Sequence, residues 1–325
     1  MSTRLAVYEL AARHAVPAAG IPVLLEAAGV GAPPRSVSTW LWRGVAVAAA
    51  ALMGLGLVLW VAANWATFGR MGRFALLEGA VVVACLAAAA RSGLRPAAGL
   101  AGLMAIGGLF AYFGQTYQTG ADAWQLFTLW AVLALPLCLG VRSDVAWAPW
   151  ALVAMTAAAL WTYAHTAHQW RVHDADLGTF TLAWSVMALL VAALSPALGR
   201  WTGAGIWAFR IAATLAIVQV MLAGLVALVD KPVPPHYVLA LCALAAAGAA
   251  AAHVRWFDVF VVSAAALAVD TVLVAGLGRL LLDGASRDPF GRLLLMGLIA
   301  AALLAGSVHL VLRLARRANL AGASA

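Results

Sequence analysis

The chain has 325 residues, of which 65% are hydrophobic and only 10% charged, and its formal net charge at pH 7 is +8. The apolar residues stand in long runs, which excludes a water-soluble core and is typical of a membrane protein, so the lipid bilayer is the expected partner. All but one of the basic residues are Arg, spread through short loops without a basic stripe or an RNA-binding motif, so no nucleic-acid partner is expected.

Residues 1–39 precede the first long apolar run. Within them, Arg4 to His14 and Pro22 to Val30 are predicted as two short amphipathic helices, followed by the helix-breaking segment 31–34. The uninterrupted apolar core and cleavage site of a signal peptide are missing, so no cleavable signal is expected. The segment is interpreted as a helical lead-in, with a partner-binding or membrane-surface module as the alternative.

Ten apolar runs are long enough to cross a bilayer, which takes about 20 residues per helix. They predict transmembrane helices over residues 40–63, 74–90, 97–113, 122–140, 145–164, 178–195, 205–229, 237–254, 257–278 and 291–312. The predicted fold class is therefore all-α. It is a polytopic helical membrane protein with a bundle over residues 40–313 and a short basic tail over residues 314–325.

The basic residues indicate which side of the membrane each loop faces. With ten spans both termini share a side, and thirteen basic residues lie on that side against seven on the other. Because basic residues accumulate in cytoplasmic loops, both termini are predicted to lie in the cytoplasm. The segment 114–124, the turn at Asn64 and the loop 165–176 then face outward.

The main candidate site is the polar segment GQTYQTGADAW, Gly114 to Trp124, between the third and fourth spans. Gly114 is predicted to end one helix, and Thr119 to cap the next one with Asp122 three residues on, a variant of the capping box. A polar break at membrane depth needs protein or water around it. The side chains expected to face water or one another are those of Gln115, Tyr117, Gln118 and Asp122. A short, well-capped hairpin between two helices is the alternative.

Two acidic residues lie inside predicted spans, where an ionisable group is costly and marks a candidate site. Glu78 comes about one turn into the second span, and Asp270 about two turns before the outer end of the ninth, so both are placed in the outer half. They could face one cavity and bind a proton or a cation. In the alternative, each is neutral or pairs with an Arg such as Arg73 or Arg279.

The loop HTAHQWRVHDAD carries three weak candidates for metal ligands, His165, His168 and His173, with Asp174 and Asp176 close by. A solvated loop is favoured because the set lacks a recognised ligand spacing. No metal or other cofactor is therefore expected. No motif for nucleophilic or zinc-dependent catalysis is present in the sequence, so an enzyme is not favoured.

Three features together resemble a known family. They are Asn64–Trp65 after the first span, the segment from Arg73 to Glu78 that opens the second, and the sequence AYFGQTYQTGADAWQLF. The chain resembles the bacterial polytopic membrane proteins grouped as domain-of-unknown-function family 2157, most specifically between Trp40 and Trp161. The resemblance implies a multi-pass protein of the bacterial inner membrane, and it implies no substrate, reaction or cofactor.

The sequence supports two main functional hypotheses. The first is transport or permeation of a small polar solute or ion through an outward-facing polar pocket. Its expected lining is Asn64, Glu78, Gln115, Tyr117, Gln118, Asp122 and Asp270. The alternative is a membrane scaffold or envelope sensor that binds proteins. A metal-dependent enzyme, which depends on the histidine loop, is the third and weakest hypothesis.

Overall fold

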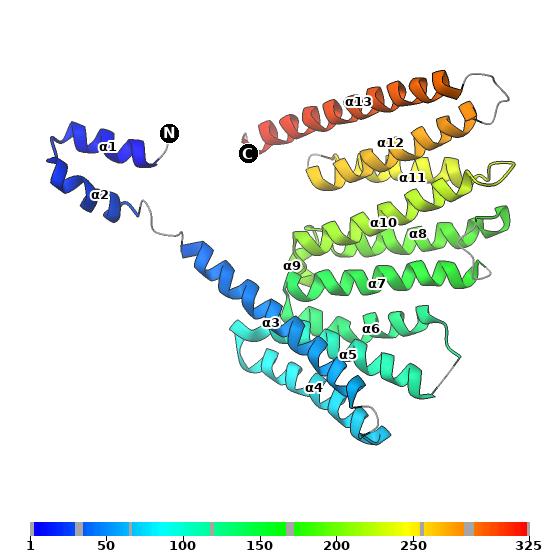
Figure 1. The fold of residues 1–325 in the computed structure, drawn as a ribbon, viewed down its shortest axis with the longest axis horizontal. Coiled ribbons are helices and arrows are strands. Elements are labelled where there is room, and N and C mark those ends of the chain that lie inside the picture. Colours follow the sequence, from blue (N-terminus) through cyan, green and yellow to red (C-terminus); the bar gives the residue numbers. More distant parts are fainter. Residues whose placement is uncertain are drawn as a thin grey trace. The chain divides into compact units, whose positions relative to one another are not determined.

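The computed structural model describes residues 3–29, 35–64, 67–117, 120–166, 172–253, 257–282 and 289–323. All regular elements in these residues are helices (Figure 1), which confirms the predicted all-α class. The chain divides into two compact units, Met1–Ala49 and Ala50–Ala325. The boundary between them falls within α3 (Arg35–Ala63).

The first unit contains two short helices, as predicted. α1 (Thr3–Arg13) and α2 (Ile21–Ala27) pack on each other and are joined through a 3-10 turn (Ala18–Gly20). Pro22 stands in the first turn of α2, where its missing N–H costs nothing. α2 is shorter than predicted and ends at Ala27.

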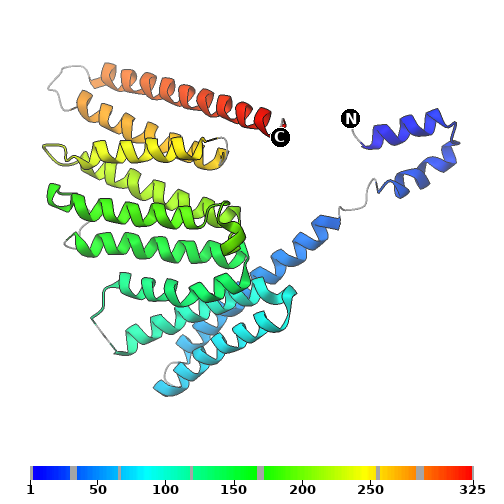
Figure 2. The ribbon, with the colours of Figure 1, turned by 180° about the vertical axis from the view of Figure 1, so that it is seen from behind.

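The second unit is a series of long helices that alternate in direction along the chain (Figures 1 and 2). After α3 they are α4 (Arg70–Ala90), α5 (Arg95–Tyr117), α6 (Ala123–Val141), α7 (Asp144–His165), α8 (Leu177–Ala193), α10 (Ile206–Ala227), α11 (His236–Ala251), α12 (Val259–Leu282) and α13 (Pro289–Ala323). Short helical turns lie between some of them: Ser92–Leu94, Asp174–Asp176 and α9 (Gly199–Thr202). α13 continues through most of the segment predicted as a tail.

Nine helices in the described residues are long and apolar enough to cross a membrane. They correspond to nine of the ten predicted spans. The remaining predicted span, residues 237–254, corresponds to the shorter α11. The 16 residues of α11 extend roughly 24 Å, whereas the hydrocarbon core is about 30 Å thick. α11 begins at His236, directly after a segment with three prolines (232–235), and ends at Ala251, so it falls short of the predicted span at its C-terminal end. It runs opposite to α10 and α12 (Figure 1).

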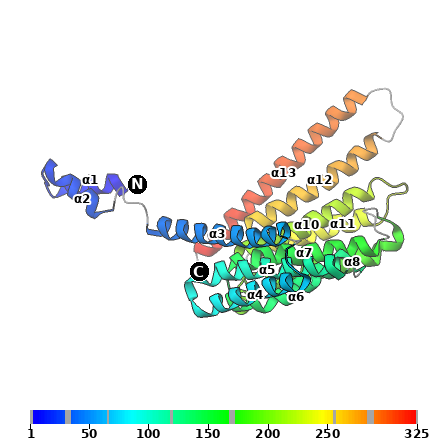
Figure 3. The same ribbon diagram turned by 60° about the horizontal axis from the view of Figure 1, so that its bottom comes forward.

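Alternate helices pack into an inner row. α5 packs on α7, α7 on α10 and α10 on α12, whereas α6 packs on α5 and α7, and α8 on α7 and α10. Figure 3 shows the same helices from below. Small residues allow the close approach that membrane helices need in the absence of a hydrophobic driving force. A Cβ at Gly107 would collide with the ring of Trp130, whose Nε1 donates to Leu103 O (2.9 Å).

The turn between α6 and α7 binds the segment between α8 and α10. The guanidinium of Arg142 donates to the carbonyl oxygens of Arg200 (2.6 Å) and Trp201 (3.3 Å). The Asp144 carboxylate accepts from the backbone N–H groups of Gly205 (2.8 Å), Trp207 (3.0 Å) and Ala208 (3.2 Å). Asp144 therefore caps the N-terminus of α10 from a distant part of the sequence, where its charge also complements the helix dipole.

Two glycines make this contact between the turns geometrically feasible. A Cβ at Gly203 would collide with Arg142, and Gly203 also has a left-handed φ of 72°. A Cβ at Gly205 would collide with the Asp144 carboxylate. We call residues 142–144 together with residues 200–208 the polar clamp. Trp147 Nε1 adds a hydrogen bond from α7 to Thr202 O (3.0 Å).

Removing the Asp144 carboxylate should destabilise the second unit. Asp144→Ala leaves three N–H groups of α10 without their acceptor, and we expect the free energy of unfolding to fall by about 2 kcal/mol or more. The measurement is thermal or denaturant unfolding in detergent. Glu78→Ala is the matched control, because Glu78 is an exposed acidic side chain that forms no salt bridge in the described residues. Equal losses for the two variants would contradict the role assigned to Asp144.

Candidate functional site

The predicted polar insert is shorter than expected. Gly114 does not end a helix, since α5 continues to Tyr117. Gly114 instead allows close packing of α5 and α6, because a Cβ there would stand 3.3 Å from Leu126. Asp122 is itself the N-cap of α6 rather than the acidic residue three positions after the cap, and its side chain makes no capping hydrogen bond. Thr119, the predicted cap, lies outside the described residues.

Most predicted site residues in this segment face outward. Gln115, Tyr117 and Asp122 are exposed, and Gln118 lies outside the described residues. Asn64 ends α3 by donating from its side chain to Trp60 O (3.0 Å). These positions do not form an enclosed polar pocket within the described residues, and they favour the alternative of a short hairpin.

An aromatic and arginine cluster at this end of α4 and α5 was not foreseen from the sequence. Phe74 lies 4.6 Å from Tyr112 and 6.0 Å from Tyr117, between ring centroids. The guanidinium of Arg70 lies 5.6 Å from the Tyr117 ring, and that of Arg73 5.9 Å from the Tyr112 ring. In addition, Tyr112 Oη donates to Arg70 O (3.3 Å). This hydrogen bond and the cation–π contacts hold the start of α4 against the end of α5. Tyr117 thus has a packing role.

Glu78 and Asp270 do not share a cavity. Glu78 is exposed on α4, whereas Asp270 is buried on α12, and these helices lie at opposite ends of the series (Figure 1). In the described residues, Glu78 forms no salt bridge. The expectation of a shared binding pair is therefore wrong, because the hairpins follow one another along the series rather than closing into a ring.

Asp270 is the only acidic side chain in the described part of the chain that is buried in the middle of a long helix. It lies 11 residues after Val259 and 12 before Leu282, so it sits halfway along α12 rather than near its outer end. Ser307 of α13 donates from Oγ to Asp270 Oδ1 (2.9 Å). Oδ2 is buried and has no hydrogen-bond partner among the described residues.

The sequence offered no pairing for Asp270 beyond Arg279. The guanidinium of Arg279 instead donates to Asp230 O (2.6 Å). The partner observed, Ser307, is a lone hydroxyl in the apolar run 293–312 of the last span, which is the one signal that could have suggested it. A carboxylate held by one hydroxyl, with its second oxygen unbonded, has the chemistry to bind a proton or a small cation.

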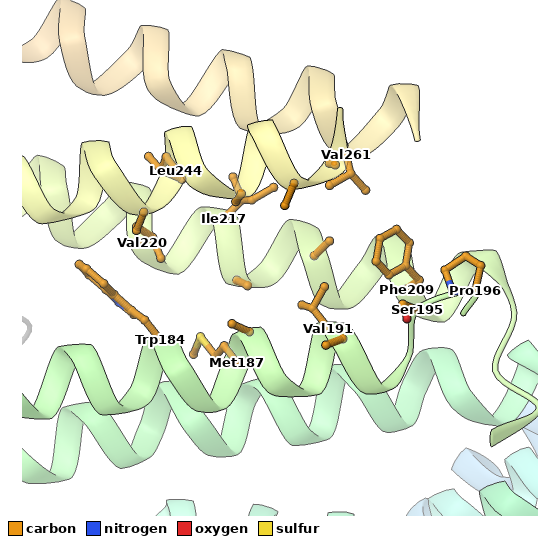
Figure 4. Close-up of a pocket in the computed structure, with 18 residues that line it drawn as sticks. Trp184, Met187, Val191, Ser195, Pro196, Phe209, Ile217, Val220, Leu244 and Val261 are labelled. Atoms are coloured by element: carbon orange, nitrogen blue, oxygen red, sulfur yellow. The ribbon is translucent and has the colours of Figure 1, made fainter. Parts of the chain in front are cut away.

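Two apolar grooves lie between helices of the second unit. One, of about 500 Å³, lies between α8 and α11 with α10 as its floor (Figure 4). The other, of about 460 Å³, lies between α6 and α8 with α7 as its floor. Neither contains a residue of the predicted polar lining, although Trp124, the last residue of the predicted segment, lines the second groove.

Comparison with known proteins identifies the first part of the chain. A family model described as "Predicted membrane protein (DUF2157)" matches residues 8–147. Over these residues the chain is similar to the DUF2157 family. The comparisons with curated proteins and with solved structures give no match.

The DUF2157 region includes the exposed hairpin, the aromatic cluster and the Arg142–Asp144 half of the polar clamp. It confirms the resemblance expected from the sequence and the membrane character of the chain. Asp270, Ser307 and the α8–α11 groove lie beyond it. The family match therefore covers the first helices of the chain and does not extend to the buried carboxylate.

The histidine loop does not gather metal ligands in the described residues. His165 bonds through Nδ1 to Trp161 O (2.8 Å) and stacks on that indole, with ring centroids 4.4 Å apart. His173 Nδ1 lies 3.5 Å from Asp176 Oδ2. His168 lies outside the described residues. Among those described, no group of three His, Cys, Asp or Glu side chains could hold a metal ion.

The exposed hairpin can be tested by thiol labelling. With Cys85 and Cys242 replaced, Gln115→Cys should react rapidly with membrane-impermeant maleimides, and small and large reagents should react at similar rates, because Gln115 is exposed. The native Cys138, which is fully buried, is the internal control and should stay unreacted. If large reagents label position 115 more than about tenfold more slowly than small ones, Gln115 lies in a narrow pocket and the exposed hairpin is contradicted.

Proposed function

We propose that this membrane protein moves protons or a small monovalent cation across the bilayer, with Asp270 as the binding group at mid-depth. The observation that carries the proposal is the buried carboxylate halfway along α12, with Ser307 on one oxygen and, among the described residues, no partner on the other. Acidic residues at this depth are costly to keep, so they mark ion and proton pathways more often than they serve packing.

The energetics favour a group that changes its charge. An ionised Asp at the centre of a transmembrane helix costs about 2.5–3.5 kcal/mol on insertion scales. Protonation, or binding of a cation, removes that cost. The Ser307 hydroxyl suits both states, since it can donate to the carboxylate and accept from the protonated acid.

The contact between α12 and α13 is the proposed moving part. α13 packs chiefly on α12, and only 6% of its most apolar stretch is buried. A helix with one main neighbour can shift without repacking the inner row. Movement of α13 along α12 would separate Ser307 from Asp270 and open the carboxylate to one side of the membrane.

The position and orientation of the protein belong to the same proposal. We place it in the bacterial inner membrane with both termini in the cytoplasm, supported by the thirteen-to-seven distribution of basic residues. This orientation requires that the short α11 crosses the bilayer, which its antiparallel course favours.

Reporter fusions test the orientation. Green fluorescent protein fused after Ala325 should fluoresce, and alkaline phosphatase inserted after His173 should be active, because these positions are assigned to the cytoplasm and the outside. If the C-terminal reporter lies outside while the alkaline phosphatase after His173 is still active, α11 does not cross the membrane. Reversal of both signals would overturn the orientation.

The transport proposal is tested in proteoliposomes. Under an imposed potential, the wild-type protein should carry H⁺, Na⁺ or K⁺, followed with an ion-sensitive dye. Asp270→Asn should lower the rate at least about tenfold, since the amide cannot bind a proton or neutralise a cation, and Ser307→Ala should lower it several-fold.

The matched control is Asp230→Asn, because Asp230 contacts Arg279 through its carbonyl oxygen. Size-exclusion profiles and unfolding temperatures should stay close to wild type for all three variants. Flux that is unchanged in Asp270→Asn would remove the carboxylate from the mechanism. A wild-type protein that carries none of the three ions would contradict transport of this class.

One observation favours the alternative of a protein-binding scaffold or sensor. The two-helix first unit leaves several large apolar side chains exposed, namely Leu5, Tyr8, Leu10 and Val23. Such residues can contact a partner or the membrane surface. Absence of ion flux in the wild-type protein would make this alternative the preferred one.

A further inference from the structure

The groove between α8 and α11, named here the α8–α11 groove, has a distinct shape. Trp184 lies at one end, and Ser195 and Pro196 at the other (Figure 4). Its floor is formed by residues of α10, including Ala213, Ala216 and Ile217. The groove exists because α8 and α11 each pack on α10, and small alanines on α10 and α11 leave the space between them open.

The length of the groove matches one leaflet of the bilayer. Trp184 and Ser195 are 11 residues apart along one side, which at 1.5 Å per residue is roughly 16 Å. The hydrocarbon core is about 30 Å thick, so half of it is about 15 Å. Ser195 lies just past the end of α8, whereas Trp184 lies near its middle. The groove thus extends from one membrane surface to the midplane.

The lining of the groove suits a hydrocarbon chain. Apart from Ser195 at the surface end, every residue that lines the groove is hydrophobic. A chain of methylene groups therefore loses no hydrogen bond when it enters the groove, whereas a polar ligand would.

An exposed cation follows the surface end of the groove in the sequence. Arg200 follows Pro196 by four residues, is exposed, and has its guanidinium 5.2 Å from the ring of Trp201. Trp201 is 67% exposed, as expected of an indole in the headgroup region. Arg210 differs, because it pairs with the buried Asp258 (3.0 Å) and is neutralised.

We infer that the α8–α11 groove binds one acyl chain of an anionic phospholipid, with the headgroup phosphate at Arg200. The apolar lining takes the chain, Trp184 closes the deep end, and Arg200 with Trp201 holds the headgroup at the surface. The site is independent of Asp270 and of ion transport.

Photo-crosslinking tests the site in the intact protein. The probe is phosphatidylglycerol with a diazirine at mid-chain, mixed into vesicles that hold the full-length protein, and the labelled peptides are mapped by mass spectrometry. Peptides of α8, α10 and α11 that line the groove should be labelled at least fivefold more than those of α13, whose side chains are largely exposed. Even labelling of all these helices would overturn the inference.

Variants that fill the groove should remove the label. Ala216→Phe and, as a second variant, Ala247→Leu place side-chain carbon in the groove and should lower its labelling at least fivefold. The matched control is Ala158→Phe, which fills the groove between α6 and α8 and should leave labelling of the α8–α11 groove unchanged. Labelling that survives both filling variants would contradict the site.

The charge of the headgroup is tested separately. The same photoreactive chain on phosphatidylcholine should label the groove several-fold less than on phosphatidylglycerol. Arg200→Gln should abolish this preference, whereas Arg91→Gln, an exposed arginine at the end of α4, should preserve it. Equal labelling by both lipids would refute an anionic phospholipid as the occupant. The same holds if native mass spectrometry shows a dimer and the groove is not labelled by lipid.

Discussion

The polar clamp is the interaction on which the second unit most depends. Helices in hydrocarbon gain little free energy from burying apolar side chains against each other, because lipid is equally apolar, so their relative positions rest on close packing and polar contacts. At the membrane surface, Arg142 and Asp144 satisfy carbonyl and N–H groups at the ends of α9 and α10 that no intrahelical bond can reach. One short turn thereby fixes α7 against α10, at the centre of the inner row.

The clamp also explains how the two parts of the chain are joined. Arg142 and Asp144 lie at the end of the DUF2157 region, and the glycines that receive them, Gly203 and Gly205, lie beyond it. Once α7 and α10 are fixed, α6, α8 and α11 can each pack on this row as separate ridges. The grooves between the ridges follow from that arrangement, and their small floor residues keep them open.

Much of this fold could be predicted from the sequence, because long apolar runs determine membrane helices one at a time. On that basis the all-α class is confirmed, and nine of the predicted spans correspond to helices in the described residues that are long and apolar enough to cross a membrane. α11 is shorter than its predicted span because it ends at Ala251. The errors lie where a residue's role depends on a neighbouring helix. Gly114 was predicted to end a helix because glycine is a helix breaker, but it instead allows close packing against Leu126 of the next helix. The partner of Asp270, Ser307, lies 37 residues away on another helix, and its lone hydroxyl in an apolar run was the one signal for it in the sequence.

The depth of Asp270 has an electrical consequence. Moving one elementary charge across the whole membrane is worth about 2.3 kcal/mol per 100 mV. A proton that reaches a carboxylate halfway along α12 crosses about half of that field, so a resting potential changes its binding free energy by roughly 1 kcal/mol per 100 mV. With Asp270 as the binding group that we propose, its depth alone would make its occupancy respond to voltage.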